Sequence, residues 1–165
     1  MTPFCFEHVF RAPSPAAVFG VYWDPAHVAE QDKRVDIVER AVLELADAPD
    51  ELRRVCRVVP RRQLPVFVRP FVSGPLHYIE TVRWRKPADE IDFEIRPSIL
   101  KGRALIAARY HLTCRAEGRV HRRYEGSVSV DVALVATRIE RGIVAEFERS
   151  MPVAAGVTQE WLDRA

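Results

Sequence analysis

The chain has 165 residues, of which 48% are hydrophobic and 29% are charged, and its formal net charge is +2. This size and balance are typical of one globular domain with its own apolar core, and they exclude a fibrous or disordered chain. Because the net charge is so small, we expect no general affinity for nucleic acid and no nucleic-acid partner.

Cysteines, histidines and apolar segments bear on location and cofactors. The three cysteines are odd in number and widely spaced, which favours small core hydrophobes in a reducing compartment. The five histidines lack metal-ligand spacing and no phosphate- or dinucleotide-binding loop is found, so we predict no metal and no cofactor. Without a basic leader or a stretch of ~20 apolar residues, the sequence predicts a cytoplasmic protein.

The chain opens with a strand and two short helices. Alternation over residues 4–10 predicts a strand, and four residues share one of its faces: Phe4, Phe6, His8 and Phe10. Ser14 and Asp24 each precede a proline, which is the pattern of a helix N-cap with proline in the first turn. We expect the first helix to reach Tyr22 and the second to end near Lys33.

From residue 35 onward the hydrophobic period is two. It predicts six further strands at residues 35–45, 52–59, 76–85, 91–95, 106–114 and 120–134. In the first of them the expected inner face comprises Val35, Ile37, Glu39, Ala41, Leu43 and Leu45. Gly126 suggests a bulge or bend in the last strand, as a sheet curving around a cavity would need.

The C-terminal segment returns to a helical period. Ile139, Ile143 and Phe147 form one apolar stripe, and the pattern continues to Leu162. Pro152 lies inside this stretch, so we expect it to kink the helix or split it.

Two segments carry a resemblance to a known superfamily: FEHVFRAPSPAAVFGVYWD at residues 6–24 and GSVSVDVALVATRIERGIVAEFE at residues 126–148. With the order of elements, they resemble the START-like superfamily, also called SRPBCC or birch-pollen-allergen-like, and within it a bacterial branch of unknown function. The resemblance implies one α+β helix-grip domain over residues 1–165. Its curved antiparallel sheet would have about seven strands, with two short helices after strand one and a long C-terminal helix packed across the sheet.

The resemblance also implies a function. Members of the superfamily bind lipids, sterols, polyketides or plant hormones, so we expect binding or transport of a small hydrophobic or lipid-like ligand between the sheet and the C-terminal helix, without catalysis. The alternative is an enzyme of the polyketide cyclase or aromatase type that uses acid and base residues of the cavity. The superfamily has no shared catalytic motif, so no catalytic residue is assigned.

Residues 60–75 have a proline at every fifth position and are rich in apolar side chains, including Phe67 and Phe71. Neither a helix nor a central strand tolerates that spacing. An apolar loop of this kind either covers the opening of a cavity or packs on the core. A further alternative is a protein-interaction module that uses residues 64–72.

Residues 53–69 contain six arginines and no acidic residue. The alternatives for this cluster are a solvated strand face, contact with anionic lipid headgroups, and attraction of an acidic ligand. We favour the solvated strand face over the membrane, because no amphipathic anchor helix accompanies the cluster.

Four polar residues occupy positions whose strand neighbours are expected to face inward: His8, Glu39, Glu80 and Arg122. A buried charge is costly unless it is paired or solvated. Three explanations stay open at this point: a register shift that exposes these groups, a structural ion pair, or contact with the polar end of a ligand. Glu80 is the strongest candidate, because it lies between Tyr78 and Val82 in a strand with a regular pattern.

Inward-facing aromatic residues complete the predicted site, although each taken alone is more typical of an ordinary core than of a ligand contact. The predicted ligand-binding residues are Tyr78, Glu80, Trp84, Phe93, Tyr110, Tyr124, Phe67, Phe71, Phe147 and His8. The expected partner is the small hydrophobic or lipid-like molecule, and the protein is expected to be a monomer or a homodimer.

Overall fold

The computed structural model describes residues 1–61 and 74–164. Seven strands form one antiparallel sheet in the order β1-β7-β6-β5-β4-β3-β2. The strands are β1 (Thr2–Arg11), β2 (Ile37–Asp47), β3 (Glu51–Pro60), β4 (Tyr78–Arg85), β5 (Glu90–Pro97), β6 (Ala104–Ala116) and β7 (Arg119–Val130). The helices are α1 (Pro15–Tyr22), α2 (Pro25–Arg34) and α3 (Ala136–Leu162), with short 3-10 turns at Lys86–Ala88 and Ile99–Gly102.

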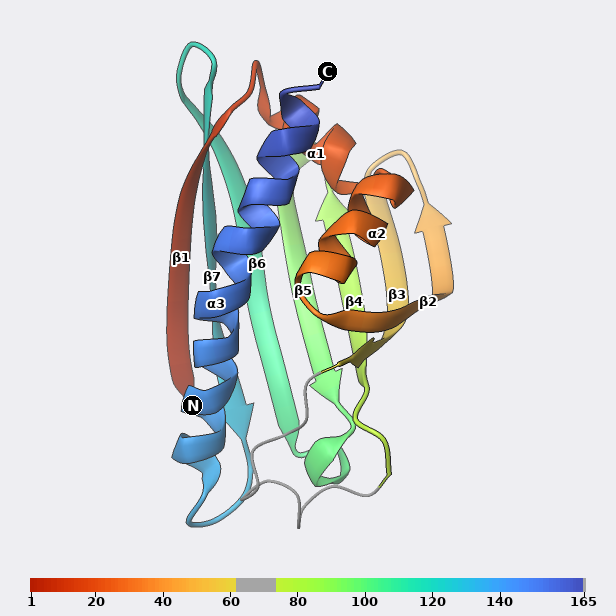
Figure 1. The fold of residues 1–165 in the computed structure, drawn as a ribbon, viewed down its shortest axis with the longest axis vertical. Coiled ribbons are helices and arrows are strands. Elements are labelled where there is room, and N and C mark those ends of the chain that lie inside the picture. Colours follow the sequence, from red (N-terminus) through yellow and green to blue (C-terminus); the bar gives the residue numbers. More distant parts are fainter. Residues whose placement is uncertain (62–73, 165) are drawn as a thin grey trace.

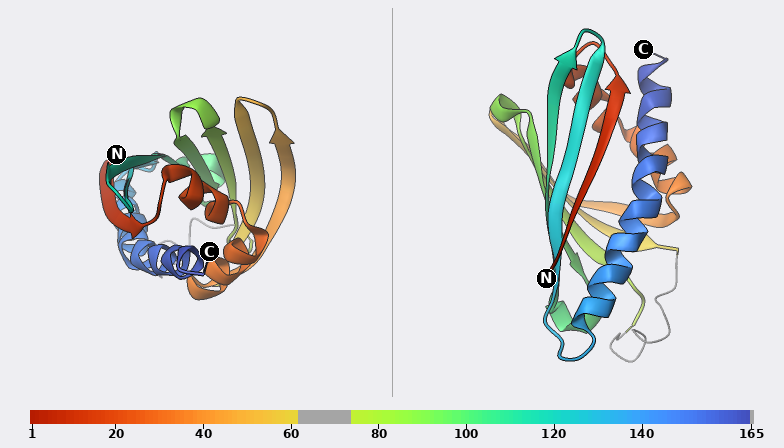
Figure 2. Two further views of the ribbon diagram at one scale, coloured as in Figure 1. Left: turned by 90° about the horizontal axis from the view of Figure 1, so that it is seen from above. Right: turned by 90° about the vertical axis from the view of Figure 1, so that its left-hand side faces the viewer.

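The sheet curls around the helices (Figure 1). The long helix α3 runs along the concave side beside β1 and β7, and it also packs on α1 and α2. Seen from above in Figure 2, the sheet and the helices together enclose a central region. The expected helix-grip arrangement is therefore confirmed.

The two short helices begin where the sequence predicts. The Ser14 hydroxyl accepts a hydrogen bond from the Ala17 N–H, and the Asp24 carboxylate accepts one from the Ala26 N–H. These side chains satisfy amide groups that a helix start leaves without partners. Helix α1 lies near one end of the sheet in Figure 1, and α2 follows it and packs against α3 and β2.

The inner face of the sheet follows from the strand register. Phe6 of β1 lies opposite Tyr124 of β7, and Tyr124 lies opposite Tyr110 of β6. Tyr110 in turn lies opposite Ile91 of β5, and all four positions belong to the core or pack against it. Because strand side chains alternate between faces, one set of every strand points toward α1 and α3.

Strand β2 departs from the expected pattern. Register shifts between Ile37 and Glu39 and again between Val42 and Glu44 interrupt its pairing with β3. A bulge inserts one residue and reverses the facing of those that follow. Arg40 therefore lies on the inner side, whereas Glu39 is exposed and pairs with Arg57 on the outside. The expected inner position of Glu39 is wrong for this reason.

Three local expectations have a definite outcome. Gly126 sits in regular pairing without a bulge, but a Cβ there would lie 2.2 Å from the Ala107 carbonyl oxygen, so close approach of β6 and β7 requires glycine. Helix α3 is one unbroken helix with Pro152 inside it, so Pro152 does not split it. Strand β7 ends at Val130, and Leu134 is fully exposed beyond it.

Candidate functional site on the concave face

An aromatic cluster covers the concave face of the sheet. The chain has four tyrosines, and all of them gather here from α1, β4, β6 and β7: Tyr22, Tyr78, Tyr110 and Tyr124. Ring centroids of successive members lie 6.3 to 6.5 Å apart, from Phe19 through Tyr110 and Tyr124 to Phe147 on α3. These distances are those of favourable aromatic pairs. The concave face of the sheet is thus apolar and bears phenol hydroxyl groups.

The phenols stay uncharged near neutral pH. Burial raises the pKa of Tyr22, Tyr78, Tyr110 and Tyr124, and the nearby charge of Glu80 raises it further for all but Tyr110. The positive charge of Arg122 opposes the shift at Tyr110. The hydroxyl groups therefore offer hydrogen bonds without adding charge to the interior.

Glu80 belongs to a buried ion-pair network. It is 8% exposed and lies 2.5 Å from the Arg40 guanidinium, which also contacts Asp32 of α2 at 2.8 Å. Burial alone lowers the pKa of Arg40, but the charge of Glu80 and the hydrogen bond to Asp32 outweigh it and raise the pKa. The network joins α2, β2 and β4, and it gives Glu80 a structural partner. Sequence reasoning missed Arg40, because the bulge in β2 places it on the inner side.

Arg122 also faces inward but has a different environment. It is 5% exposed, and its guanidinium lies over the rings of Phe10 and Tyr110, at 5.3 and 5.6 Å. Among the described residues no carboxylate forms an ion pair with it, and its Nε is buried without an acceptor. The structural carboxylate partner considered for Arg122 is therefore not found in the described part of the chain. Stacking on rings compensates only part of the cost of burying a cation.

His8 is the neighbour of Arg122 across the β1–β7 pair. Its ring lies 4.7 Å from that of Phe10. Burial lowers the pKa of His8, and the positive charge of Arg122 lowers it further. A neutral imidazole and a guanidinium therefore lie side by side on the inner face.

A second inward arginine lies at the end of the cluster near α1. The Arg54 guanidinium is 4.8 Å from the ring of Trp23, which stacks on Trp84 at 6.0 Å. The indole N–H groups of both tryptophans and the Nε of Arg54 are buried without partners among the described residues. Buried donors normally find acceptors, so this corner of the interior has unused hydrogen-bonding capacity.

Eight of the ten predicted ligand-binding residues lie around this interior. Those on the sheet are His8, Tyr78, Glu80, Trp84, Phe93, Tyr110 and Tyr124, and Phe147 belongs to α3. Phe67 and Phe71 lie outside the described residues, as does the loop segment 64–72. Their roles as lid or interaction surface remain predictions.

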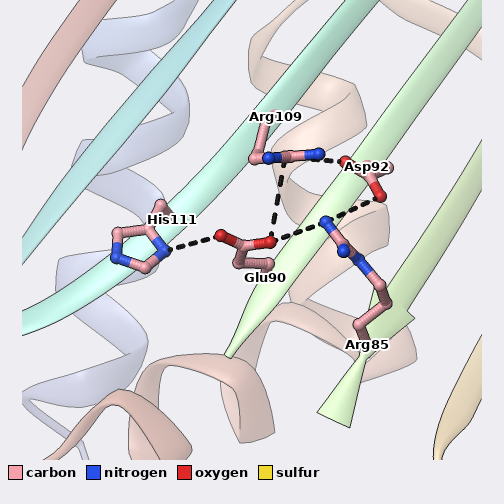
Figure 3. Close-up of polar contacts among 5 residues, drawn as sticks. All are labelled: Arg85, Glu90, Asp92, Arg109 and His111. Carbon is pink, nitrogen blue, oxygen red and sulfur yellow. Dashed lines mark hydrogen bonds and ion pairs between the residues drawn. The ribbon is translucent and has the colours of Figure 1, made fainter. Parts of the chain in front are cut away.

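The outer face of the sheet carries charged networks instead. Arg53 pairs with Glu44 and Arg57 with Glu39, which fits the solvated strand face expected for this part of the arginine cluster. Figure 3 shows a second network, in which Glu90 lies 2.6 Å from Arg85 and 3.5 Å from the His111 ring. Asp92 and Arg109 extend it across β5 and β6. These side chains are partly exposed, as in a surface ion-pair network.

A shallow depression lies at the β1–β7 pair, away from the ion-pair network of Glu80. Its volume is about 560 Å³, and it is lined by Pro3, Phe4, Cys5, Glu125 and Gly126. Cys5 and Glu125 are exposed and face away from the core, whereas Phe4 is buried and its ring packs against Tyr124 and Phe147 of the aromatic cluster.

The comparisons with known proteins identify the family. Residues 6–162 match the model of a family described as a protein of unknown function, DUF2505, and the chain belongs to that family. A comparison with curated protein sequences finds no match. Within the described residues, no helix is long and apolar enough to cross a membrane.

Solved structures share the fold at low sequence identity. A START superfamily protein from Mycobacterium smegmatis aligns with a TM-score of 0.63 at 8% identity, over 99% of both chains. The Zhui aromatase/cyclase from Streptomyces sp. R1128 aligns with 0.65 at 9% identity, over 98% of this chain and 93% of the other. Norcoclaurine synthase from Thalictrum flavum, in complex with dopamine and hydroxybenzaldehyde, aligns with 0.68 at 11% identity, over 99% and 87%. The fold is START-like.

Proposed function

We propose that this protein binds a small hydrophobic molecule between the concave face of the sheet and helix α3. The observation that carries the proposal is the gathering of all four tyrosines of the chain on that face, beside phenylalanine and tryptophan rings. An apolar wall with a few convergent polar groups is the usual chemistry of a ligand site. Burial of the ligand's apolar surface would supply the affinity, and the hydroxyl groups its orientation.

Binding without catalysis is favoured over the cyclase-type reaction. A general acid or base works best when its pKa lies near the operating pH. The tyrosines have pKa values raised further above neutrality, and Glu80 forms an ion pair with Arg40. The aromatase/cyclase and norcoclaurine synthase share the fold at identities of 9% and 11%. Similarity at this level assigns no catalytic residue to this chain.

The experiment has two parts. Native mass spectrometry of gently purified protein is expected to show a mass excess that disappears on denaturation. Titration with the uncharged probe N-phenyl-1-naphthylamine is expected to give saturable fluorescence enhancement. Replacement of Phe93 by Ala should weaken this binding, whereas Leu43→Ala, at an exposed position of β2, should leave it unchanged.

Two results together would contradict the proposal. These are a spectrum of the bare chain mass alone and a probe that fails to bind the folded protein. If Phe93→Ala and Leu43→Ala weakened probe binding equally, the probe would be bound outside the interior.

A further inference from the structure

We propose that the ligand is an acid whose anionic group binds Arg122, while its apolar body lies against the aromatic cluster. This inference rests on the proposed function and specifies the ligand class. The three inward-facing arginines differ in whether they have a carboxylate partner. Arg40 has two carboxylate partners, whereas Arg54 and Arg122 have none among the described residues.

Arg122 is the better placed of the two unpaired arginines. Its side chain is 5% exposed, so water reaches little of it, whereas Arg54 is more exposed. An unpaired cation in such a place is unfavourable in the empty protein, and a bound anion would relieve it. Guanidinium groups suit this purpose, because they stay charged and present paired N–H donors to a carboxylate.

The described neighbours of Arg122 provide no negative charge. His8 has a lowered pKa, and the phenol of Tyr110 has a raised pKa, so both are neutral near pH 7. Among the described residues, three inward-facing arginines stand against the two carboxylates Asp32 and Glu80, which leaves one positive charge in excess. The buried Glu140 does not alter this balance, because it pairs with the N-terminal ammonium of Met1. A ligand with a single negative charge would balance it.

The aromatic cluster gives the position of the apolar body. The Arg122 guanidinium lies over the ring of Tyr110. The centroid of that ring is 5.8 Å from the ring of Tyr22 and 6.3 Å from the ring of Phe93. An apolar group extending from an anion at Arg122 would therefore lie against these rings. Both a planar aromatic acid and a chain-like fatty acid have this chemistry, and the experiment separates them.

The main experiment compares two probes with similar aromatic bodies. The anionic probe is 1-anilinonaphthalene-8-sulfonate, and the uncharged probe is N-phenyl-1-naphthylamine. Arg122→Met should lower the preference for the anionic probe, measured as the ratio of the two Kd values, by about tenfold or more. Affinity for the uncharged probe should change by less than about twofold, since its contacts are apolar.

The adjacent residue Arg123 gives the matched control. It lies on the same strand, faces the outer surface, and pairs with Glu125 at 2.8 Å. Arg123→Met removes the same charge, so any long-range effect on the anionic probe would be equal. We expect it to leave the ratio unchanged. If Arg122→Met fails to fold, Arg122→Gln replaces it, with the same expected loss.

Competition identifies the kind of acid. Displacement of the anionic probe by 1-naphthoate would indicate a planar acid, and displacement by dodecanoate a chain-like acid. Each should compete better than the corresponding alcohol in the unmodified protein, and this advantage should vanish in Arg122→Met.

Three outcomes would overturn the inference: an unchanged ratio in the folded Arg122 variants, an equal loss in Arg123→Met, or displacement by neither acid. In those cases the uncharged probe still binds, and the proposed function survives. If neither probe binds, the proposed function itself fails.

Discussion

At the scale of single residues, buried charge distinguishes the interior of this protein from an ordinary core. Glu80 and Asp32 share the guanidinium of Arg40, whereas Arg122 stacks on two rings without a carboxylate. A paired buried charge supports the fold only while its partner is present. An unpaired one costs stability and is therefore the better candidate for function.

The Arg40 network makes a first prediction. Arg40→Met leaves two carboxylates without their cation on the inner side, so we expect a loss of about 3–5 kcal/mol in the free energy of unfolding. Urea denaturation measures this loss in the free energy of unfolding. Arg57→Met serves as control, because its pair with Glu39 is half exposed and should contribute less than about 1 kcal/mol. Equal effects of the two substitutions would contradict the buried network.

Two glycines make a second prediction with opposite signs. Gly126→Ala should destabilise the protein by about 1–3 kcal/mol, because its Cβ would collide with the backbone of β6. Gly142→Ala lies in α3 with open space around it and should stabilise by about 0.5–1 kcal/mol. Thermal unfolding monitored by circular dichroism would show both shifts. If Gly126→Ala left the stability unchanged, strands β6 and β7 could move apart at this position without a cost in free energy.

At the scale of elements, helices α2 and α3 are joined by a polar contact as well as by packing. His27 of α2 is 1% exposed, and its Nε2 lies 3.1 Å from the Thr158 hydroxyl of α3. The rings of His27 and Trp161, which is also on α3, pack in a T-shaped arrangement. The contact between α2 and α3 therefore includes a buried imidazole, which makes it sensitive to acid.

The stability of this contact should depend on pH. Burial lowers the pKa of His27, although Asp24 opposes the shift, so the unfolded chain binds the proton more readily than the folded one. Its contribution is complete above the unfolded value of about 6.5 and is lost as pH falls through the lower folded value. His8 contributes with the same sign.

The variant His27→Gln isolates the contribution of that residue. Its free energy of unfolding should fall less between neutral pH and about pH 5 than that of the unmodified protein. His111→Asn, at a partly exposed site on the outer face, is the control. Parallel curves for the unmodified protein and His27→Gln would contradict the prediction.

The outer network of Figure 3 should matter much less than the inner one. Glu90→Gln removes ion pairs with Arg85 and Arg109 whose members are partly exposed. We expect a loss below about 1 kcal/mol at low ionic strength, which disappears in about 1 M salt. Urea denaturation at both salt concentrations provides the measurement. A loss that persists in salt would show that the network is effectively buried.

At the scale of the whole molecule, one sheet and one set of helices share a single core. The rings of Phe4 and Tyr124 on the sheet and Phe147 on α3 contact one another directly. Elements from both ends of the chain, β1 and α3, pack side by side in Figure 1. Such shared packing is expected to make unfolding cooperative.

The three tryptophans can report this cooperativity. Trp23 follows α1, Trp84 lies in β4 and Trp161 in α3, so together they sample the interior and the closing helix. Fluorescence and far-UV circular dichroism should give coincident urea transitions, with a slope of about 1–3 kcal/mol per M. Separate transitions would mean that α3 and the sheet unfold as independent units, against the single domain predicted for residues 1–165.

The sequence by itself determined the order of elements, both helix starts and most inner faces, because caps and alternation are local properties. It placed Tyr78, Glu80 and Tyr110 correctly on the inner side for that reason. It misplaced Glu39 and missed Arg40, since a bulge depends on how β2 pairs with β3. Only the tertiary structure decided which charges have partners: Glu80 has Arg40, and Arg122 has the side chains of Phe10 and Tyr110 but no carboxylate among the described residues. Ion pairing depends on distances between segments far apart in the chain, which no local pattern contains.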